Sequence, residues 1–73
     1  MKPLKGRVVD FDEAAGMGMV EAEPQAGGPP RRHPFHCTQI ADGSRSVAVG
    51  AEVTFHLIAG RLGSWEAGGV TAL

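Results

Sequence analysis

The chain has 73 residues, with seven Lys and Arg against eight Asp and Glu, which gives a formal net charge of −1 at pH 7. A chain this short cannot form two units that each bury a usable core, so one domain over residues 1–73 is expected, and with a single cysteine no internal disulfide can stabilise it. With this near-neutral charge, the chain as a whole lacks the strongly basic character that nucleic-acid-binding proteins usually show, and any basic surface is expected on the loops.

The first third of the chain predicts two strands. Residues 6–11 are rich in β-branched and aromatic side chains, and this run stops at the turn-forming residues 12–16. Across residues 17–22 the side chains alternate, so that Met17 and Met19 share one face with a glutamate while a glycine, a valine and an alanine share the other. The small aliphatic set is expected to face inward, which directs the two methionines outward.

The middle of the chain predicts a loop followed by a short strand. Residues 23–32 contain prolines and glycines that cannot hold a regular ladder, because proline lacks the N–H donor and glycine carries a high entropic cost. A strand is expected over residues 33–37, with Phe35 directed to the core. Pro34 and His36 are then expected on the opposite face.

The last third predicts a long connection and two further strands. Residues 41–50 are expected to form the connection, and the strand after it alternates with Val53, Phe55 and Leu57 facing inward. Glycines break the run before a last strand at about residues 65–70. These segments predict an all-β protein with five antiparallel strands, and so short a chain buries their apolar faces by curling them into a barrel.

The order of several motifs resembles the cold-shock domain family. Residues 6–12, followed by Gly-Met-Gly-Met-Val at 16–20, are similar to the first two strands of that family, whose second strand carries Gly-Phe-Gly-Phe-Ile. Phe-His-Cys-Thr-Gln-Ile at 35–40 resembles the family's Val-His-Phe-Ser-Ala-Ile, and residues 49–63 match its fourth strand and the following turn. The resemblance implies an OB-type β-barrel that binds single-stranded RNA or DNA on an outward face, where aromatic rings stack on successive bases.

Most ring positions of that family's binding face carry other side chains in this sequence. Only His36 keeps its ring, and the family's lysines on the first strand and before the glycine motif align with Val9 and Ala15. Both the stacking and the phosphate contributions to binding are therefore reduced. The replacements at the ring positions are Asp10, Met17, Met19, Pro34, Cys37 and Ser44.

The function that the resemblance implies is binding of single-stranded nucleic acid, weak and with little sequence preference. Phe11, Trp65 and the loop arginines are expected to contribute beside the aligned positions. The residues expected at the nucleic-acid-binding surface are Asp10, Phe11, Met17, Met19, Pro34, His36, Cys37, Ser44, Arg45 and Trp65.

Several of these residues also have an interpretation that needs no ligand. Met17 and Met19 either form an adaptable contact surface or merely cover the outside of the barrel. His36 either stacks on a base or is a half-exposed strand histidine, and Trp65 either replaces lost aromatic surface or closes the barrel. The loop arginines either surround the binding face or only make the protein soluble. They are Arg31, Arg32, Arg45 and Arg61.

A second hypothesis keeps the barrel and changes the ligand. In it the altered face contacts a protein partner, which is consistent with the methionines, the acidic first strand and the missing lysines. Composition does not separate the two hypotheses. A monomer or weak dimer is expected in either case.

Metal chemistry, catalysis and membrane insertion are not expected. His33, His36 and Cys37 offer ligands that zinc prefers, but the two histidines point to opposite faces of one strand and no second cluster exists. Cys37 and His36 diverge in the same way, and paired carboxylates and a phosphate-binding loop are missing, so no cofactor and no enzyme activity are predicted. A lone cysteine, without a signal peptide or an apolar run of about 20 residues, predicts a cytoplasmic location.

Overall fold

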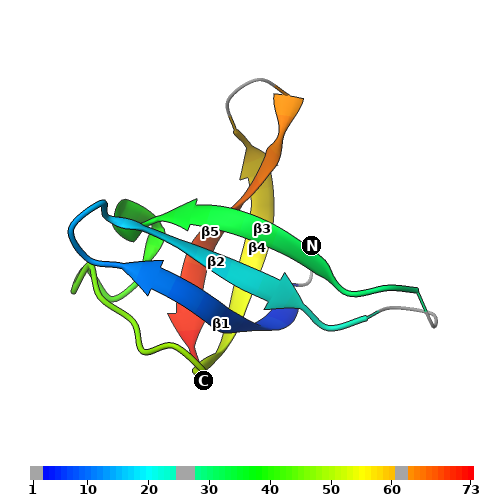
Figure 1. Cartoon of the computed structure of the whole chain (residues 1–73), viewed down its shortest axis with the longest axis horizontal. Helices are drawn as coiled ribbons and strands as arrows, with labels where there is room; N and C mark the ends of the chain where they lie inside the picture. Colours follow the sequence, from blue (N-terminus) through cyan, green and yellow to red (C-terminus); the bar gives the residue numbers. More distant parts are fainter. Residues whose placement is uncertain (1–2, 25–27, 61–62) are drawn as a thin grey trace.

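The computed structural model describes residues 3–24, 28–60 and 63–73. Strands make up most of it, and one short 3₁₀ turn, η1, follows the third strand. Arg61 and the centre of the expected 23–32 loop lie outside the described residues. The elements in chain order are β1 (Leu4–Asp12), β2 (Met17–Ala22), β3 (Arg31–His36), η1 (Cys37–Gln39), β4 (Glu52–Ala59) and β5 (Trp65–Ala72), as Figure 1 shows.

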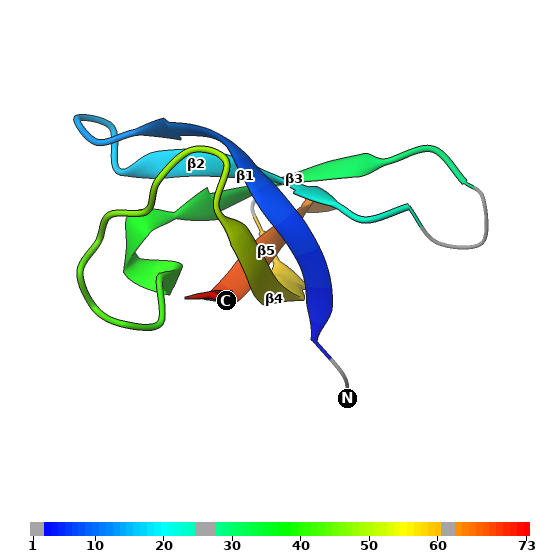
Figure 2. The same cartoon turned by 90° about the horizontal axis from the view of Figure 1, so that it is seen from below.

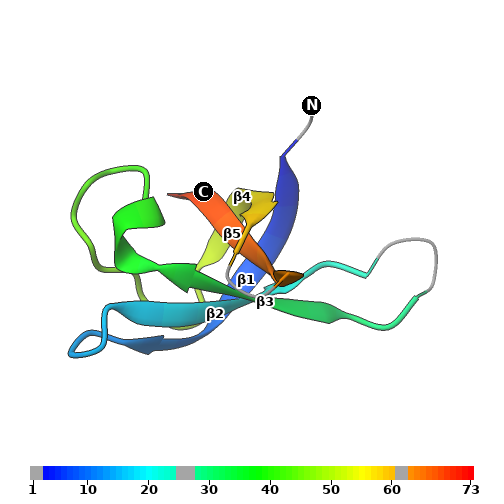
Figure 3. The ribbon, with the colours of Figure 1, turned by 90° about the horizontal axis from the view of Figure 1, so that it is seen from above.

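The strands form one sheet of five, in the order β3-β2-β1-β4-β5, and all the paired neighbours are antiparallel. The all-β class and the antiparallel arrangement are therefore confirmed. The sheet bends sharply, so that β1, β2 and β3 lie across β4 and β5 (Figures 1 and 2). In Figure 3, β2 lies on one side and β4 and β5 on the other, while β1 runs from one to the other.

The prediction of a closed barrel is wrong, because strand pairing does not continue all the way around the sheet. Within the part of the chain that the structure describes, β3 and β5 are the edges of the sheet, and one parallel bridge between Ile40 and Val70 joins the segments near them. Regular pairing ends at β3, because η1 turns the chain aside directly after this strand. On the other edge, Gly69 has a φ of +59° and its N–H donates to the Gln39 side chain at 3.2 Å instead of to a strand.

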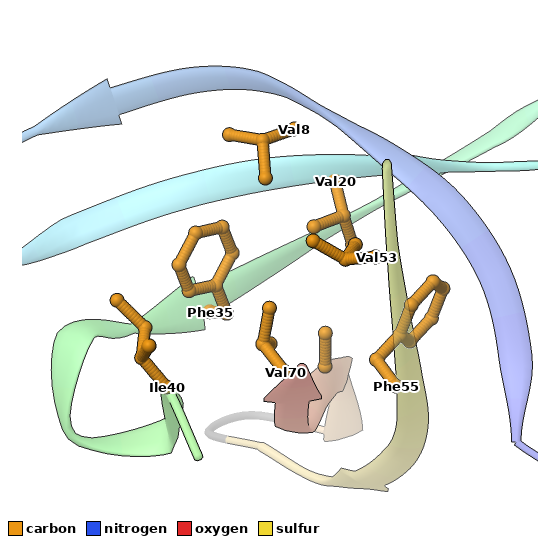
Figure 4. Packing of buried hydrophobic residues seen from close by; sticks show 8 residues of the cluster. Val8, Val20, Phe35, Ile40, Val53, Phe55 and Val70 are labelled. Atoms are coloured by element: carbon orange, nitrogen blue, oxygen red, sulfur yellow. The ribbon is translucent and has the colours of Figure 1, made fainter. Parts of the chain in front are cut away.

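The core lies between the two layers and draws on every strand. Figure 4 shows how its side chains converge. On β2 the burial alternates as expected, with Gly18 and Val20 buried and the methionines outside. Gly18 is required there, because a Cβ would approach the Phe35 ring to 2.5 Å and the Asp10 carbonyl oxygen to 2.7 Å. The buried hydrophobic residues are Val8, Val20, Phe35, Ile40, Val53, Phe55, Ala67 and Val70.

Strand bounds differ from the sequence expectations at both ends of β3, and β1 (Leu4–Asp12) and β5 (Trp65–Ala72) extend beyond the expected 6–11 and 65–70. β3 begins at Arg31 rather than at His33, because Arg31 and Arg32 pair with the end of β2. β3 ends before Cys37, which belongs to η1. Leu57, expected in the core, is 40% exposed, because β4 and β5 continue past the core as the projecting hairpin seen in Figure 1 and their register shifts between Thr54 and His56.

Candidate binding face on β1, β2 and β3

The outward side chains of three neighbouring strands form rows across the sheet. Pairing places Asp10 and Pro34 on either side of Met19, and Asp12 and His36 on either side of Met17. Five of the residues predicted for the binding surface are thus brought together. We call this surface the methionine face, defined by Asp10, Met17, Met19, Pro34 and His36.

Burial confirms that the methionine face points away from the core. Met17 is 38% exposed, Asp10 and His36 are exposed, and Met19 and Pro34 are half-buried. The side chains that alternate with them on β2 and β3 fill the core instead. The face is therefore a largely apolar strip across β2 and β3, with an acidic border on β1.

That acidic border is part of the turn between β1 and β2. The Asp12 Oδ1 atom accepts hydrogen bonds from the N–H groups of Ala14 at 3.0 Å and Ala15 at 3.2 Å. Asp12 and Asp10 are exposed, as is Glu13 in the turn itself. Carboxylates at these positions give the border a negative potential, which repels phosphate groups.

Arginines next to the methionine face are already paired with carboxylates. In the adjacent row, Arg7 lies opposite Glu21 across β1 and β2, and Glu21 lies opposite Arg32 across β2 and β3. The Arg7 guanidinium lies 3.1 Å from a Glu52 carboxylate oxygen, and that of Arg32 lies 3.2 Å from Glu21. These ion pairs contribute little to stability because they are exposed, but they cancel positive charge that would otherwise attract phosphates.

Phe11 is not part of the methionine face. Its ring stacks on Phe35 at a centroid distance of 5.9 Å with 10° between the planes, and it packs at the margin of the core. The cause is a register shift between Val8 and Asp10, which turns Asp10 outward and Phe11 inward. Its predicted role in stacking on a base is therefore not supported by its position.

Cys37 lies at one end of the methionine face rather than in its rows. Its N–H donates to the Gly16 carbonyl at 2.8 Å, and its side chain is half-buried against the core. A Cβ on Gly16 would lie 3.0 Å from the Cys37 sulfur, so the turn and η1 are closely packed. Cys37 therefore holds η1 against the β1–β2 turn at the end of the methionine face.

The loop between η1 and β4 approaches the β1–β2 turn (Figure 2). The Ser46 hydroxyl donates to a Glu13 carboxylate oxygen at 3.1 Å, which ties the two segments together. Ser44 and Arg45 are exposed on this loop, and Arg45 has a φ of +59°. Of the loop arginines predicted to surround the face, Arg45 is therefore in a segment held next to it.

Within the same loop, Asp42 accepts a hydrogen bond from the Ser44 N–H at 2.8 Å. This bond, with a smaller contribution from the Ser44 side chain, holds the pKa of Asp42 below its usual value. Ser44 also donates from its hydroxyl to the Ser46 carbonyl at 2.9 Å. Ser44, which was predicted to contact the ligand, therefore makes several of the hydrogen bonds within this loop.

Trp65 belongs to a different surface. It is 58% exposed at the start of β5 and lines a pocket of about 480 Å³ together with Leu4, His33 and Leu57, none of which belongs to the methionine face. The ring of His33 also lies 6.1 Å from that of Phe55, on the inner side of the sheet. Sequence reasoning missed this pocket because it depends on how far the β4–β5 hairpin extends beyond the core.

Histidine and cysteine side chains are spread over separate surfaces. His33 faces the pocket and His36 faces outward, as their positions in one strand require. Over residues 3–24, 28–60 and 63–73, no three His, Cys, Asp or Glu side chains gather in an arrangement suited to a metal ion. In those ranges there is also no helix of the length and apolar character needed to cross a membrane.

Comparison with known proteins does not assign this geometry to a family. No protein-family model matches the chain, and no curated protein matches it either.

Proposed function

We propose that this protein is a divergent, partly open OB-type barrel that resembles cold-shock domains and binds single-stranded nucleic acid on the methionine face. The strand order supports this, because it leaves β3 and β5 as edges with the Ile40–Val70 bridge beside them. An OB fold is a partly open five-stranded barrel that binds oligonucleotides on its second and third strands and adjoining loops. The methionine face lies largely on those two strands.

The observation that carries the proposal is the alignment of Met17, Met19, Pro34 and His36 on one exposed side of β2 and β3. Every base has a flat face that packs on apolar and aromatic side chains without regard to sequence. Thioethers also contact aromatic rings favourably. Binding with little sequence preference follows, and it is weak because His36 contributes the one ring of the face.

Electrostatics also favours low affinity. Asp10 and Asp12 border the face, Arg7 and Arg32 are paired with carboxylates, and Arg45 is left at one end. The logarithm of affinity should therefore fall with the logarithm of salt concentration by a slope equivalent to only about 2 to 3 phosphates.

The test is a titration of the isotopically labelled protein with a short pyrimidine-rich strand at low and moderate salt, followed by amide NMR. Shifts are expected on β2 and β3 around the methionine face, and His36→Ala should weaken binding. His56→Ala is the matched control, because His56 is an exposed histidine on β4. Shifts confined to the Trp65 pocket, or equal binding by both variants, would show that the methionine face is not the binding surface.

A protein partner is the second candidate, and the acidic border is the observation that favours it. A basic peptide would place its cations beside Asp10 and Asp12 and its apolar side chains on Met17 and Met19. This alternative predicts that a lysine-rich amphipathic peptide shifts the same amides while the nucleic-acid strand does not.

A further inference from the structure

Three side chains with soft or borderline donor atoms meet on the methionine face. Met17 lies directly opposite His36 across β2 and β3. Met19 is two residues further along β2, opposite Pro34, and therefore diagonal to His36 on the same side of the sheet. Two thioether side chains, of exposed Met17 and half-buried Met19, and the exposed His36 imidazole are thus neighbours on one side of the sheet.

The spacing lets these donors converge on one point. Directly opposed side chains in an antiparallel sheet have Cβ atoms about 5 Å apart, and residues two apart along a strand are separated by about 7 Å. Methionine has three rotatable bonds, so its sulfur can move over several ångströms. Met17 is 38% exposed, and among the described residues no hydrogen bond or ion pair holds the His36 ring. The His36 ring therefore breaks no polar contact with a described residue when it turns toward an ion.

The donor set selects the kind of ion. Thioethers are soft ligands that favour Cu(I), and imidazole also binds copper well. Hard cations such as Mg²⁺ and Ca²⁺ require oxygen ligands instead. The carboxylates of Asp10 and Asp12, opposite Met19 and Met17 respectively, add negative potential that attracts a cation.

We propose that Met17, Met19 and His36 bind one Cu(I) ion on the methionine face. This site goes beyond nucleic-acid binding and does not depend on it. No metal was expected from the sequence, and only ligands from histidine and cysteine were weighed there. In contrast, this site uses thioethers, and the same carboxylates that oppose phosphate binding favour the cation.

Affinity is measured on the full chain, without oxygen and without thiol reductants, by competition for Cu(I) with a chromophoric chelator. One equivalent should bind. The Met17→Leu/Met19→Leu double variant should bind at least tenfold more weakly, and so should His36→Gln. Leucine preserves the apolar volume, so the fold is expected to be retained and is checked by circular dichroism. His56→Gln is the matched control and should leave the affinity unchanged.

Cys37 is the competing soft ligand, and Cys37→Ser separates its contribution. The proposal requires this variant to keep most of its Cu(I) affinity. As a second readout, redox-inert Ag(I) should shift the methyl resonances of Met17 and Met19 and the ring resonances of His36. The proposal is overturned if Cys37→Ser abolishes binding while the double leucine variant binds normally, or if the wild-type chain does not bind.

The copper proposal and the nucleic-acid proposal can each be refuted without refuting the other. The double leucine variant keeps an apolar surface for bases, so its affinity for a single strand should stay within about threefold of the parent. Loss of copper binding with retained strand binding supports the metal site alone. Strand binding that is absent from both proteins, together with copper binding by the parent, removes the nucleic-acid function and leaves the metal site intact.

Discussion

Restoring aromatic rings to the methionine face should strengthen binding of a single strand. The variant is Asp10→Trp/Met17→Phe/Met19→Phe. Asp10 and Met19 are direct cross-strand partners, and Met17 lies on the same side of β2. The three new rings would therefore be neighbours on the outside of the sheet, where they displace no core side chain.

The magnitude follows from stacking and charge. Alanine substitution removes about 1 to 3 kcal/mol per stacked base, and we expect on the order of 1 kcal/mol per restored ring because methionine already makes some contact. The contributions do not add fully, since the three positions are neighbours on one face. Loss of the Asp10 carboxylate also relieves repulsion of phosphates. Because about 1.4 kcal/mol corresponds to a factor of ten, binding should tighten roughly tenfold to a hundredfold.

The assay is fluorescence anisotropy of a labelled short strand at two salt concentrations. The matched control is His56→Phe, which adds a ring at an exposed position on β4. It should leave the affinity unchanged. If the triple variant folds and binds no better than the parent, these positions do not act as a shared surface for bases, and the protein-partner hypothesis is then favoured.

Three other substitutions or titrations test the structure. Gly18→Ala should destabilise the protein by about 3 kcal/mol in urea unfolding, because the new Cβ meets the buried Phe35 ring and a backbone oxygen; a loss below about 0.5 kcal/mol would contradict this packing. Asp12→Ala should cost about 1 kcal/mol, since two N–H groups of the turn lose their acceptor; Asp12→Asn keeps an acceptor and should cost less. The carboxyl of Asp42 should titrate by NMR below its value in the unfolded chain. Its contribution to stability is then present above the unfolded pKa and is lost as pH falls through the folded one; equal values in the two states would exclude the hydrogen bond from Ser44.

Sequence reasoning succeeded where local alternation and packing agree. The boundaries of β2 were predicted correctly, because turn-forming residues precede it and its side chains alternate between small and large. Phe35, Val53 and Phe55 were placed in the core for the same reason and are fully buried. The outward direction of Met17 followed from this alternation as well.

The failures arose where the structure departs from strict alternation or depends on distant segments. At the shift between Val8 and Asp10, one extra residue exchanges the two faces of β1, and no local signal in the sequence shows that Phe11 turns inward. Leu57 continues the inward pattern of β4 but lies past the end of the core. The start of β3 at Arg31 was hidden by the preceding prolines, because pairing with β2 outweighs that local composition.

β1 is the strand that pairs with both layers, with β2 on one side and β4 on the other, and this has a consequence for how the chain folds. The β1–β2, β2–β3 and β4–β5 pairs join segments that are close in sequence. Pairing of β1 with β4 instead joins Leu4 to Phe55 and Arg7 to Glu52, which are separated by most of the chain. Closing so long a loop costs entropy before any contact repays it, so docking of β1 on β4 should be the slow step after the hairpins form within microseconds. Substitutions at this seam are therefore expected to reduce the folding rate.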